Sequence, residues 1–376
     1  MKFADFPGYE ATKQSLIQAA RAGRVAHARL FSASEGGFGL MMALAYAQFL
    51  NCENQQEDDS CGNCPSCLKS SRFIHPDFHY LFPIAKTKKI DTDELSPHLP
   101  AFRSFMESQP WGGLHEWIES AGFENRTPII NVKAVRECIR NLQLKAFEAR
   151  YKIQIIWLPE SMKNEGANAL LKILEEPAPF TVFLVVSQEA DNLLPTLLSR
   201  MQRINMGSPG EEELHIFLER KFPAGKDLIR MAVSLSEGSI TAAIRMLEEK
   251  PDDYHPWYME WQRACYRRDG AQILRMAEEF HEMSRDLQKL LLQYSLNKTR
   301  KALVLAAGPP EILHLQENEQ KELPNLGKIL QPEMAEQILG EIDRAWYHID
   351  RNASSRMVFF DTSMAISDAY KMKPAG

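Results

Sequence analysis

The sequence predicts an α/β domain built on a parallel sheet, followed by an all-helical region. Two continuous apolar runs, Ile153–Leu158 and Thr181–Val186, resemble strands that are buried on both faces of such a sheet. Helical patterns separate the strands, an alternation typical of parallel α/β folds. After Ile204 the pattern is helical throughout. Its clearest apolar stripes are Leu287, Leu290, Leu291 and Tyr294, and Ile338, Ile342, Trp346 and Ile349.

The first fifty residues predict a strand, a glycine-containing loop and a helix. An amphipathic helix over 10–22 precedes a short strand over Arg29–Ser32. The loop Ala33–Gly39 leads into an apolar helix over Leu40–Leu50. This order of elements opens a P-loop unit.

Further along, the pattern is uneven. Residues 78–128 are rich in Pro, Trp and charge, and we interpret them as an irregular insertion without an assigned role. A helix is predicted over 132–147. Ser161 is predicted to cap the helix that ends before Pro177, and residues 208–211 form a capping box with proline at the first helical position.

Composition and charge limit the classes of function. With 376 residues the chain is too long for one compact domain, and its 44% hydrophobic and 25% charged residues are ordinary for a soluble globular protein. No secretory signal or run of eighteen apolar residues is present, so we expect a cytoplasmic protein. The net charge of −6 argues against autonomous DNA binding, so any DNA contact should be local or made through an assembly.

The glycine-containing loop departs from a working P-loop. In the pattern G-x-x-x-x-G-K-[ST], the lysine neutralises phosphates and the hydroxyl ligates magnesium. The loop here runs from Ala33 through Gly36 and Gly37, but Gly39 stands at the lysine position and Leu40 at the hydroxyl position. A plain glycine-rich turn that never bound a nucleotide explains this loop equally well.

The strand Ile153–Leu158 is followed by Pro159 and Glu160. A Walker B strand ends in acidic residues that hold magnesium and polarise water. Glu160 is the one carboxylate at this position, and by itself it is a weak signal because many helices begin with glutamate.

A cluster of four cysteines predicts a zinc site. The spacing is C-x8-C-x2-C-x2-C, and four thiolates can complete a tetrahedral shell around Zn²⁺. Four buried thiols are the bland alternative. An iron–sulfur cluster is the more specific alternative, but Ser71 stands where the fourth ferredoxin cysteine belongs. His75 could compete as a ligand of the zinc ion. The proposed ligands are Cys52, Cys61, Cys64 and Cys67.

Two longer motifs carry a family resemblance. The string Asn168–Pro177 (NALLKILEEP) directly follows the Walker B strand, and Leu193–Gln202 contains Ser199-Arg200 with Met201 in place of a cysteine. Over roughly residues 3–75 and 130–250 the chain resembles the AAA+ clamp-loader family of bacterial DNA polymerase III, which includes the delta prime and gamma/tau subunits.

The resemblance implies roles for individual residues. Arg200 would be an arginine finger that acts in trans on a neighbouring subunit's ATP. The cysteines match the family's zinc module. The segment Gly238–Ala243 resembles sensor 2, with Thr241 at the arginine position. Because the P-loop lysine, its hydroxyl and the sensor arginine are all missing, we expect a silent subunit of the delta prime type without intrinsic ATPase activity.

The resemblance also implies architecture and partners. We expect a RecA-like AAA+ domain over 1–206, with a zinc module (51–77) and the insertion (78–128), a helical lid over 207–250 and a helical collar over 251–376. The protein would join delta-type and gamma/tau-type subunits in a hetero-oligomeric ring of the DNA polymerase III holoenzyme, without membrane contact. It would meet the sliding clamp and primed DNA through this complex.

Two other functions remain open from sequence. One is an active gamma/tau-type ATPase with an unusual P-loop, against which the missing lysine argues. The other is a zinc-dependent nucleic-acid-binding protein, against which the acidic charge and the scarcity of basic–aromatic clusters argue. A small basic group, Lys298, Arg300 and Lys301, is expected to be a solvated helix end.

Overall fold

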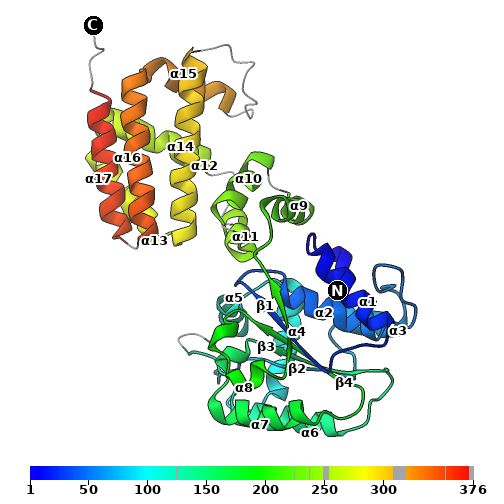
Figure 1. Ribbon diagram of the computed structural model, residues 1–376. Helices are drawn as coiled ribbons and strands as arrows, with labels where there is room; N and C mark the ends of the chain where they lie inside the picture. Colours follow the sequence, from blue (N-terminus) through cyan, green and yellow to red (C-terminus); the bar gives the residue numbers. More distant parts are fainter. Residues whose placement is uncertain are drawn as a thin grey trace. The chain divides into compact units, whose positions relative to one another are not determined.

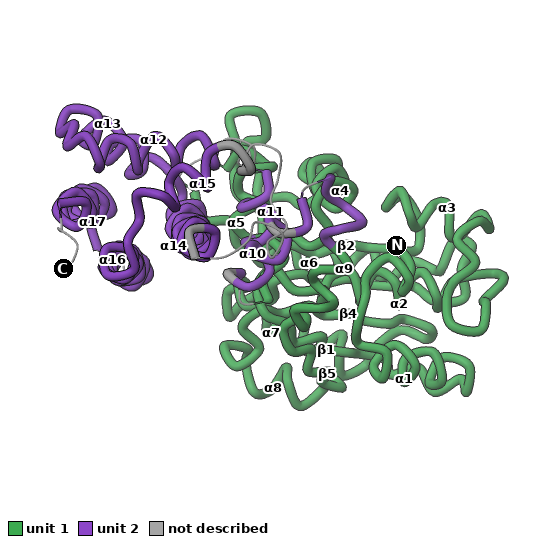
Figure 2. The backbone as a smooth tube through the Cα atoms, turned by 90° about the horizontal axis from the view of Figure 1, so that it is seen from above, with its two compact units in different colours: residues 1–217, 237–241 green, residues 218–236, 242–376 purple. Residues whose placement is uncertain are grey.

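The computed structural model describes residues 1–376 except 124–125, 224, 237, 249–253, 308–318, 352 and 372–376. The chain forms two compact units (Figure 2). Unit 1 comprises residues 1–217 and 237–241, and unit 2 comprises 218–236 and 242–376. The predicted boundary between lid and collar at residue 250 falls outside the described residues, so the three-region division stays a prediction.

Unit 1 is built on a five-stranded sheet whose strand order is β2-β3-β4-β1-β5. All four neighbouring pairs are parallel. The apolar runs form the central strands β3 and β4, whose residues are buried throughout. The predicted parallel α/β fold is thus confirmed. The strands span β1 Ala28–Ala33, β2 Phe78–Leu81, β3 Lys152–Trp157, β4 Thr181–Ser187 and β5 Gln202–Met206.

Helices cover both faces of this sheet (Figure 1). The helix α2 packs on β1, β3 and β4, with α1 and α3 beside it, while α6 and α7 pack together on the opposite face. Every residue of α2 is buried, which fits its apolar sequence. The helices span α1 Glu10–Arg21, α2 Gly39–Leu50, α3 Pro65–Ser71, α6 Val132–Gln143, α7 Asn164–Glu175 and α8 Pro195–Leu198.

The prediction of an irregular insertion over 78–128 was wrong. This segment contains β2 and two helices, α4 Leu99–Ser108 and α5 Leu114–Ala121. An aromatic cluster holds it together: the rings of Phe82 and Phe102 stack at 3.8 Å, and Trp117 meets Phe102 edge-on at 5.4 Å. Large rings bury enough area to order a segment without a regular apolar period.

Three predicted helix boundaries also need correction. The helix predicted over 132–147 ends at Gln143, because the backbone N–H groups of 147–149 donate to Asp77. Ser161 lies in a short 3-10 turn, and α7 starts at Asn164 instead. The predicted capping box of 208–211 is not formed, because α9 begins at Glu211 and the Gly210 N–H donates to the Glu213 carboxylate instead.

Unit 2 is helical over its described residues. The predicted stripe around Leu290 is buried, as are Ile338, Ile342 and Ile349. The prediction that the basic group of Lys298, Arg300 and Lys301 is solvated was wrong in part. Lys298 is buried, with its ammonium 4.7 Å from the centre of the Tyr294 ring. No described helix has the length and apolar character needed to cross a membrane. The remaining helices are α9 Glu211–Lys221, α10 Lys226–Leu235, α11 Ile240–Glu248, α12 Tyr254–Arg267, α13 Gly270–Glu282, α14 Arg285–Ala307, α15 Glu319–Ile329, α16 Pro332–Asp350 and α17 Ser355–Ala369.

Candidate functional site

The helix α2 begins at Gly39, the position where a working P-loop has its lysine. A Cβ atom at Gly39 would lie 2.7 Å from the Cβ of Ala33 and 3.3 Å from Cγ1 of Val186. The Ala33 Cβ is attached directly to the backbone of β1 and cannot swing aside. Position 39 therefore has no room for a side chain unless β1 and α2 move apart.

The neighbouring Phe38, which carried no signal in the sequence, stands where the second glycine of the P-loop pattern belongs. Its side chain is completely buried. It stacks on Phe6 at 5.3 Å and meets the edges of Phe217 at 5.1 Å and Tyr9 at 6.2 Å between ring centroids. The loop that would cradle phosphates is thus part of an aromatic core.

The segment predicted to correspond to sensor 2 lies directly on the same loop. Gly36 has a φ of +67°, and a Cβ there would lie 2.5 Å from the side-chain oxygens of both Ser239 and Thr241. The Ile240 N–H donates to the Gly36 carbonyl at 2.7 Å. Close approach and left-handed backbone both require glycine at position 36. The structure therefore brings the predicted P-loop and sensor 2 positions together.

Glu160 is engaged within the fold. Its carboxylate accepts a hydrogen bond from the Ser187 hydroxyl and another from the Gln188 N–H, each at 2.9 Å. Burial raises the pKa of Glu160, although these hydrogen bonds oppose the shift. In this geometry the carboxylate ties the start of the α7 segment to the end of β4.

Arg200 lies at the opposite end of the strands from the P-loop, because it precedes β5 whereas the loop follows the parallel neighbour β1. Its guanidinium pairs with the Glu175 carboxylate at 2.5 Å and donates to the Thr196 carbonyl at 2.7 Å. The side chain remains 34% exposed. Glu175 belongs to the NALLKILEEP string, so the two family motifs meet here.

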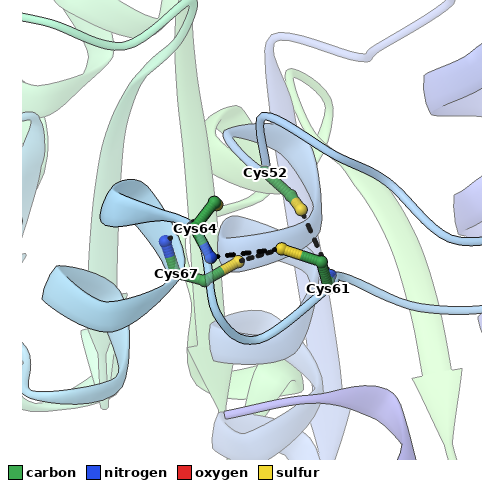
Figure 3. A group of neighbouring side chains, drawn as sticks. All are labelled: Cys52, Cys61, Cys64 and Cys67. Atoms are coloured by element: carbon green, nitrogen blue, oxygen red, sulfur yellow. Dashed lines mark hydrogen bonds between the residues drawn. The ribbon is translucent and has the colours of Figure 1, made fainter.

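The four cysteines come together between the end of α2 and the start of α3 (Figure 3). Their sulfur atoms all lie within 4.8 Å of one another, and Cys61 Sγ is 3.9 Å from Cys67 Sγ. Sulfurs at the corners of a tetrahedron with bonds of about 2.3 Å are roughly 3.8 Å apart. A cluster spreads its cysteines over several iron atoms, so this spacing suits one ion better. His75 is not among these ligand atoms.

Backbone amides support the cysteine sulfurs. The N–H groups of Cys61, Cys64 and Cys67 donate to the sulfurs of Cys52, Cys61 and Cys64 at 3.2–3.4 Å. Burial raises the pKa of Cys52 and Cys67, while amide donors outweigh desolvation and lower the pKa of Cys61 to about 6. N–H donors stabilise negative sulfur, which is the form that binds a metal.

A buried histidine and aspartate lie beside this module. His75 Nδ1 accepts the Asp77 N–H at 3.1 Å, and Asp77 accepts the three N–H groups of Phe147, Glu148 and Ala149 at 2.6–2.9 Å. The pKa of Asp77 is lowered, because these amides outweigh its burial. The tripeptide His75-Pro76-Asp77, noted in the sequence as recurring in the family, was the signal available for this anchor.

Comparison with known proteins identifies the family. The family described as DNA polymerase III, delta subunit, matches residues 8–209, which is more than half of the chain. The chain belongs to this family.

Curated relatives agree with this placement. The Escherichia coli DNA polymerase III subunit delta′ is 26% identical over 245 residues, which cover 65% of this chain and 61% of that protein. The Haemophilus influenzae delta′ is 28% identical over 59% of this chain and 55% of its own length. The Escherichia coli tau subunit is 24% identical over 66% of this chain and 32% of its own.

The matched region spans about three fifths of these delta′ relatives, and the family match ends at residue 209. The family match therefore contains the P-loop position, the cysteines and Arg200, but not the helices of unit 2. Among solved structures, a DNA polymerase III gamma subunit-related protein from Thermotoga maritima aligns over 96% of this chain with 14% identity and a TM-score of 0.39.

Proposed function

We propose that the chain is a non-hydrolysing, delta′-type subunit of a DNA polymerase III clamp loader. Gly39 is the observation that carries the proposal, because a side chain at the lysine position would collide with Ala33. The family match and the delta′ relatives support the placement. The buried Phe38 and the engaged Glu160 argue against the alternative of an active gamma/tau-type motor.

In this role the chain occupies one place in a hetero-oligomeric ring with delta-type and gamma/tau-type subunits. The ring loads the sliding clamp on primed DNA. The chain itself contributes scaffold surface and one arginine, and it meets clamp and DNA as part of the assembly. Its net charge of −6 supports this arrangement over independent DNA binding.

The isolated chain should not bind Mg-ATP. Backbone amides alone cannot replace the positive charge of a P-loop lysine. Calorimetric titration of the full chain is expected to show no saturable heat, with a gamma/tau-type subunit as the positive control. Micromolar affinity would overturn the proposal of a silent subunit.

Arg200 is proposed to serve a neighbour's ATP. In the free chain its guanidinium pairs with Glu175, an exposed contact that a phosphate can displace. A guanidinium is permanently charged and donates two parallel hydrogen bonds to phosphate oxygens. Glu175 would therefore hold the finger in place until the neighbouring nucleotide site closes.

The test of this role is Arg200→Ala in the reassembled ring. Arginine fingers accelerate phosphoryl transfer by on the order of 10³-fold or more, although several sites in one ring dilute the effect. Clamp- and DNA-stimulated ATP hydrolysis should fall clearly while assembly is retained, and Arg200→Lys should not rescue it. Arg203→Ala is the matched control, since Arg203 is 40% exposed and pairs with Asp191. Stimulated ATP hydrolysis at the wild-type rate by the Arg200→Ala ring would refute the assignment.

The cysteine module is proposed to hold one zinc ion through Cys52, Cys61, Cys64 and Cys67. Zn²⁺ takes four thiolates in a tetrahedron and supplies a structural cross-link without redox chemistry. The sulfur spacing and the N–H donors to sulfur support this choice. Metal analysis of the purified chain should find about one zinc, whereas iron with visible absorbance would contradict it.

A further inference from the structure

A cavity of about 380 Å³ lies between α12 and α15 in unit 2. We call it the α12 cavity. Its volume falls within the range of ligand pockets in proteins, which is about 300–1,000 Å³. Each helix lines it with one face, because the residues recur at i, i+3, i+4 and i+7. They are Met259, Gln262, Arg263 and Tyr266 from α12, and Glu322, Asn325, Leu326 and Ile329 from α15, with Arg267 and Tyr370 completing the lining.

Much of this lining is apolar or aromatic. Met259 and Leu326 are each 6% exposed, so their side chains are fixed by the surrounding helices. The rings of Tyr266 and Tyr370 meet edge-on, with their centroids 5.5 Å apart. Tyr266 is 56% exposed, so one side of its ring is accessible from solvent. Aromatic walls beside a polarizable methionine favour a ligand with a flat apolar group.

A buried amide in the lining has an unused hydrogen-bond donor. Gln262 is 2% exposed, and its Oε1 accepts the Tyr370 hydroxyl at 2.7 Å. Burial raises the pKa of Tyr370, so the phenol keeps the proton that it donates to this oxygen. The amide nitrogen Nε2 of Gln262 has no hydrogen-bond partner among the described residues. Because a buried donor without a partner is destabilising, a ligand that supplies an acceptor would be stabilised here.

The charged groups of the lining are cationic on balance. Arg263 and Arg267 contribute two guanidinium groups, against the one carboxylate of Glu322. Arg263 already pairs with that carboxylate at 2.6 Å. Arg267 is exposed, and it has no ion-pair partner within the part of the chain that the structure describes. A guanidinium in this position can donate two parallel hydrogen bonds to a carboxylate.

We propose that the α12 cavity binds a small aromatic carboxylate. The ring of the ligand lies against Tyr266 and Met259, its carboxylate binds Arg267, and a further oxygen accepts the Nε2 hydrogen of Gln262. An inorganic anion would leave the apolar lining uncovered, and an uncharged ring would leave Arg267 without a partner. The inference is independent of the proposed function, because the cavity lies wholly in unit 2, beyond the family match that ends at residue 209.

The test titrates the full chain, labelled with carbon-13 at its methionine methyl groups, with N-acetylphenylalanine. The NMR signal of Met259, assigned with Met259→Leu, should shift and saturate. For a ligand of this size we expect a dissociation constant on the order of 1 mM. Met357 is the internal control, because it is 68% exposed on α17 and outside the cavity lining, so its signal should stay in place.

Two related compounds separate the contributions of charge and ring. N-Acetylphenylalanine amide keeps the ring but lacks the negative charge, and it should bind about fivefold more weakly. N-Acetylglycine keeps the carboxylate but lacks the ring, and it should bind roughly tenfold more weakly.

Variants of two exposed residues assign these contributions to the cavity. Arg267→Gln should weaken binding of the acid by about fivefold and leave the affinity for the amide compound unchanged, because only the acid carries the charge that Arg267 binds. Arg275→Gln is the matched control, since Arg275 is an exposed arginine on α13 outside the lining. Tyr266→Ala should weaken binding of both compounds, because each loses the same ring contact.

Three results would overturn the inference. The first is no saturable shift of Met259 at about ten times the expected dissociation constant. The second is equal affinity for the acid and its amide, and the third is equal weakening by Arg267→Gln and Arg275→Gln. Each of them would leave the proposed function untouched, because that proposal is tested by the Mg-ATP titration and the Arg200 variants.

Discussion

The two ends of α2 differ in what has happened to their ligand chemistry. At its amino end the P-loop residues are replaced, and Phe38 and Gly39 pack into the core. At its carboxyl end, Cys52 begins a cluster that retains four sulfurs within 4.8 Å. The helix between them is buried along its whole length. One helix therefore serves the core, while the residues of the P-loop pattern are replaced at one end and four sulfurs that could hold a metal gather at the other.

On the proposed function, this difference shows how a loop that no longer binds a nucleotide can become part of the fold. A helix amino terminus favours phosphate, so an empty loop there would leave polar groups without partners. Here Gly36 accepts the Ile240 N–H, and Phe38 meets three other aromatic rings. The contacts that close the loop now stabilise unit 1, so reversing a single substitution should not restore nucleotide binding.

The largest expected effect lies at the carboxyl end of α2. Cys64→Ser should release the metal and loosen residues 51–77, because a metal site and its local fold form together; structural zinc supplies about 10–16 kcal/mol in small zinc-finger peptides. The sheet should survive, since its core lies in β3 and β4. Metal analysis measures the release of the ion, and the far-UV circular dichroism spectrum reports whether the rest of the fold survives.

Cys265→Ser is the control for this prediction. Cys265 is buried on α12, outside the cluster, so its loss should leave the metal content unchanged. If Cys64→Ser keeps a full equivalent of metal, the four-thiolate site is wrong.

Much of the fold could be predicted because its central strands have a clear sequence pattern. The runs around Ile155 and Leu184 are continuous and apolar, as central parallel strands must be. The insertion could not be predicted, because the ring of Phe102 contacts both Trp117 within the segment and Trp157 on the distant strand β3. The end of α6 was missed for a similar reason: Asp77, far back in the chain, captures the amides that would have continued the helix.

The candidate site divides in the same way. Cysteine spacing and the missing lysine are local patterns, so Cys61, Cys64 and Gly39 could be identified from sequence. The contact of Gly36 with Thr241 joins residues some two hundred positions apart, which no local pattern reveals.

A smaller effect is expected at the amino end of α2. Gly39→Ala should destabilise unit 1 by about 1 kcal/mol, since overpacking costs about 1–3 kcal/mol and the gain in helix propensity offsets up to about 1 kcal/mol. Gly270→Ala is a matched control, because Gly270 also starts a helix but a Cβ there would meet nothing within 4 Å. It should stabilise unit 2 slightly. Denaturant unfolding, followed through the separate transition of each unit, measures both changes in stability.

The collision itself can be isolated with a double-mutant cycle. If the Cβ of Ala33 excludes a side chain at position 39, then Ala33→Gly should reduce the loss of stability caused by Gly39→Ala. The expected coupling energy is roughly 0.5–2 kcal/mol. Ala33→Gly alone destabilises β1, so the comparison must use the coupling and not the stability of either single variant. Additive effects would mean that α2 shifts freely to admit a side chain. The amino end of α2 would then be merely vacant, and a lysine introduced at position 39 could reach a phosphate after all.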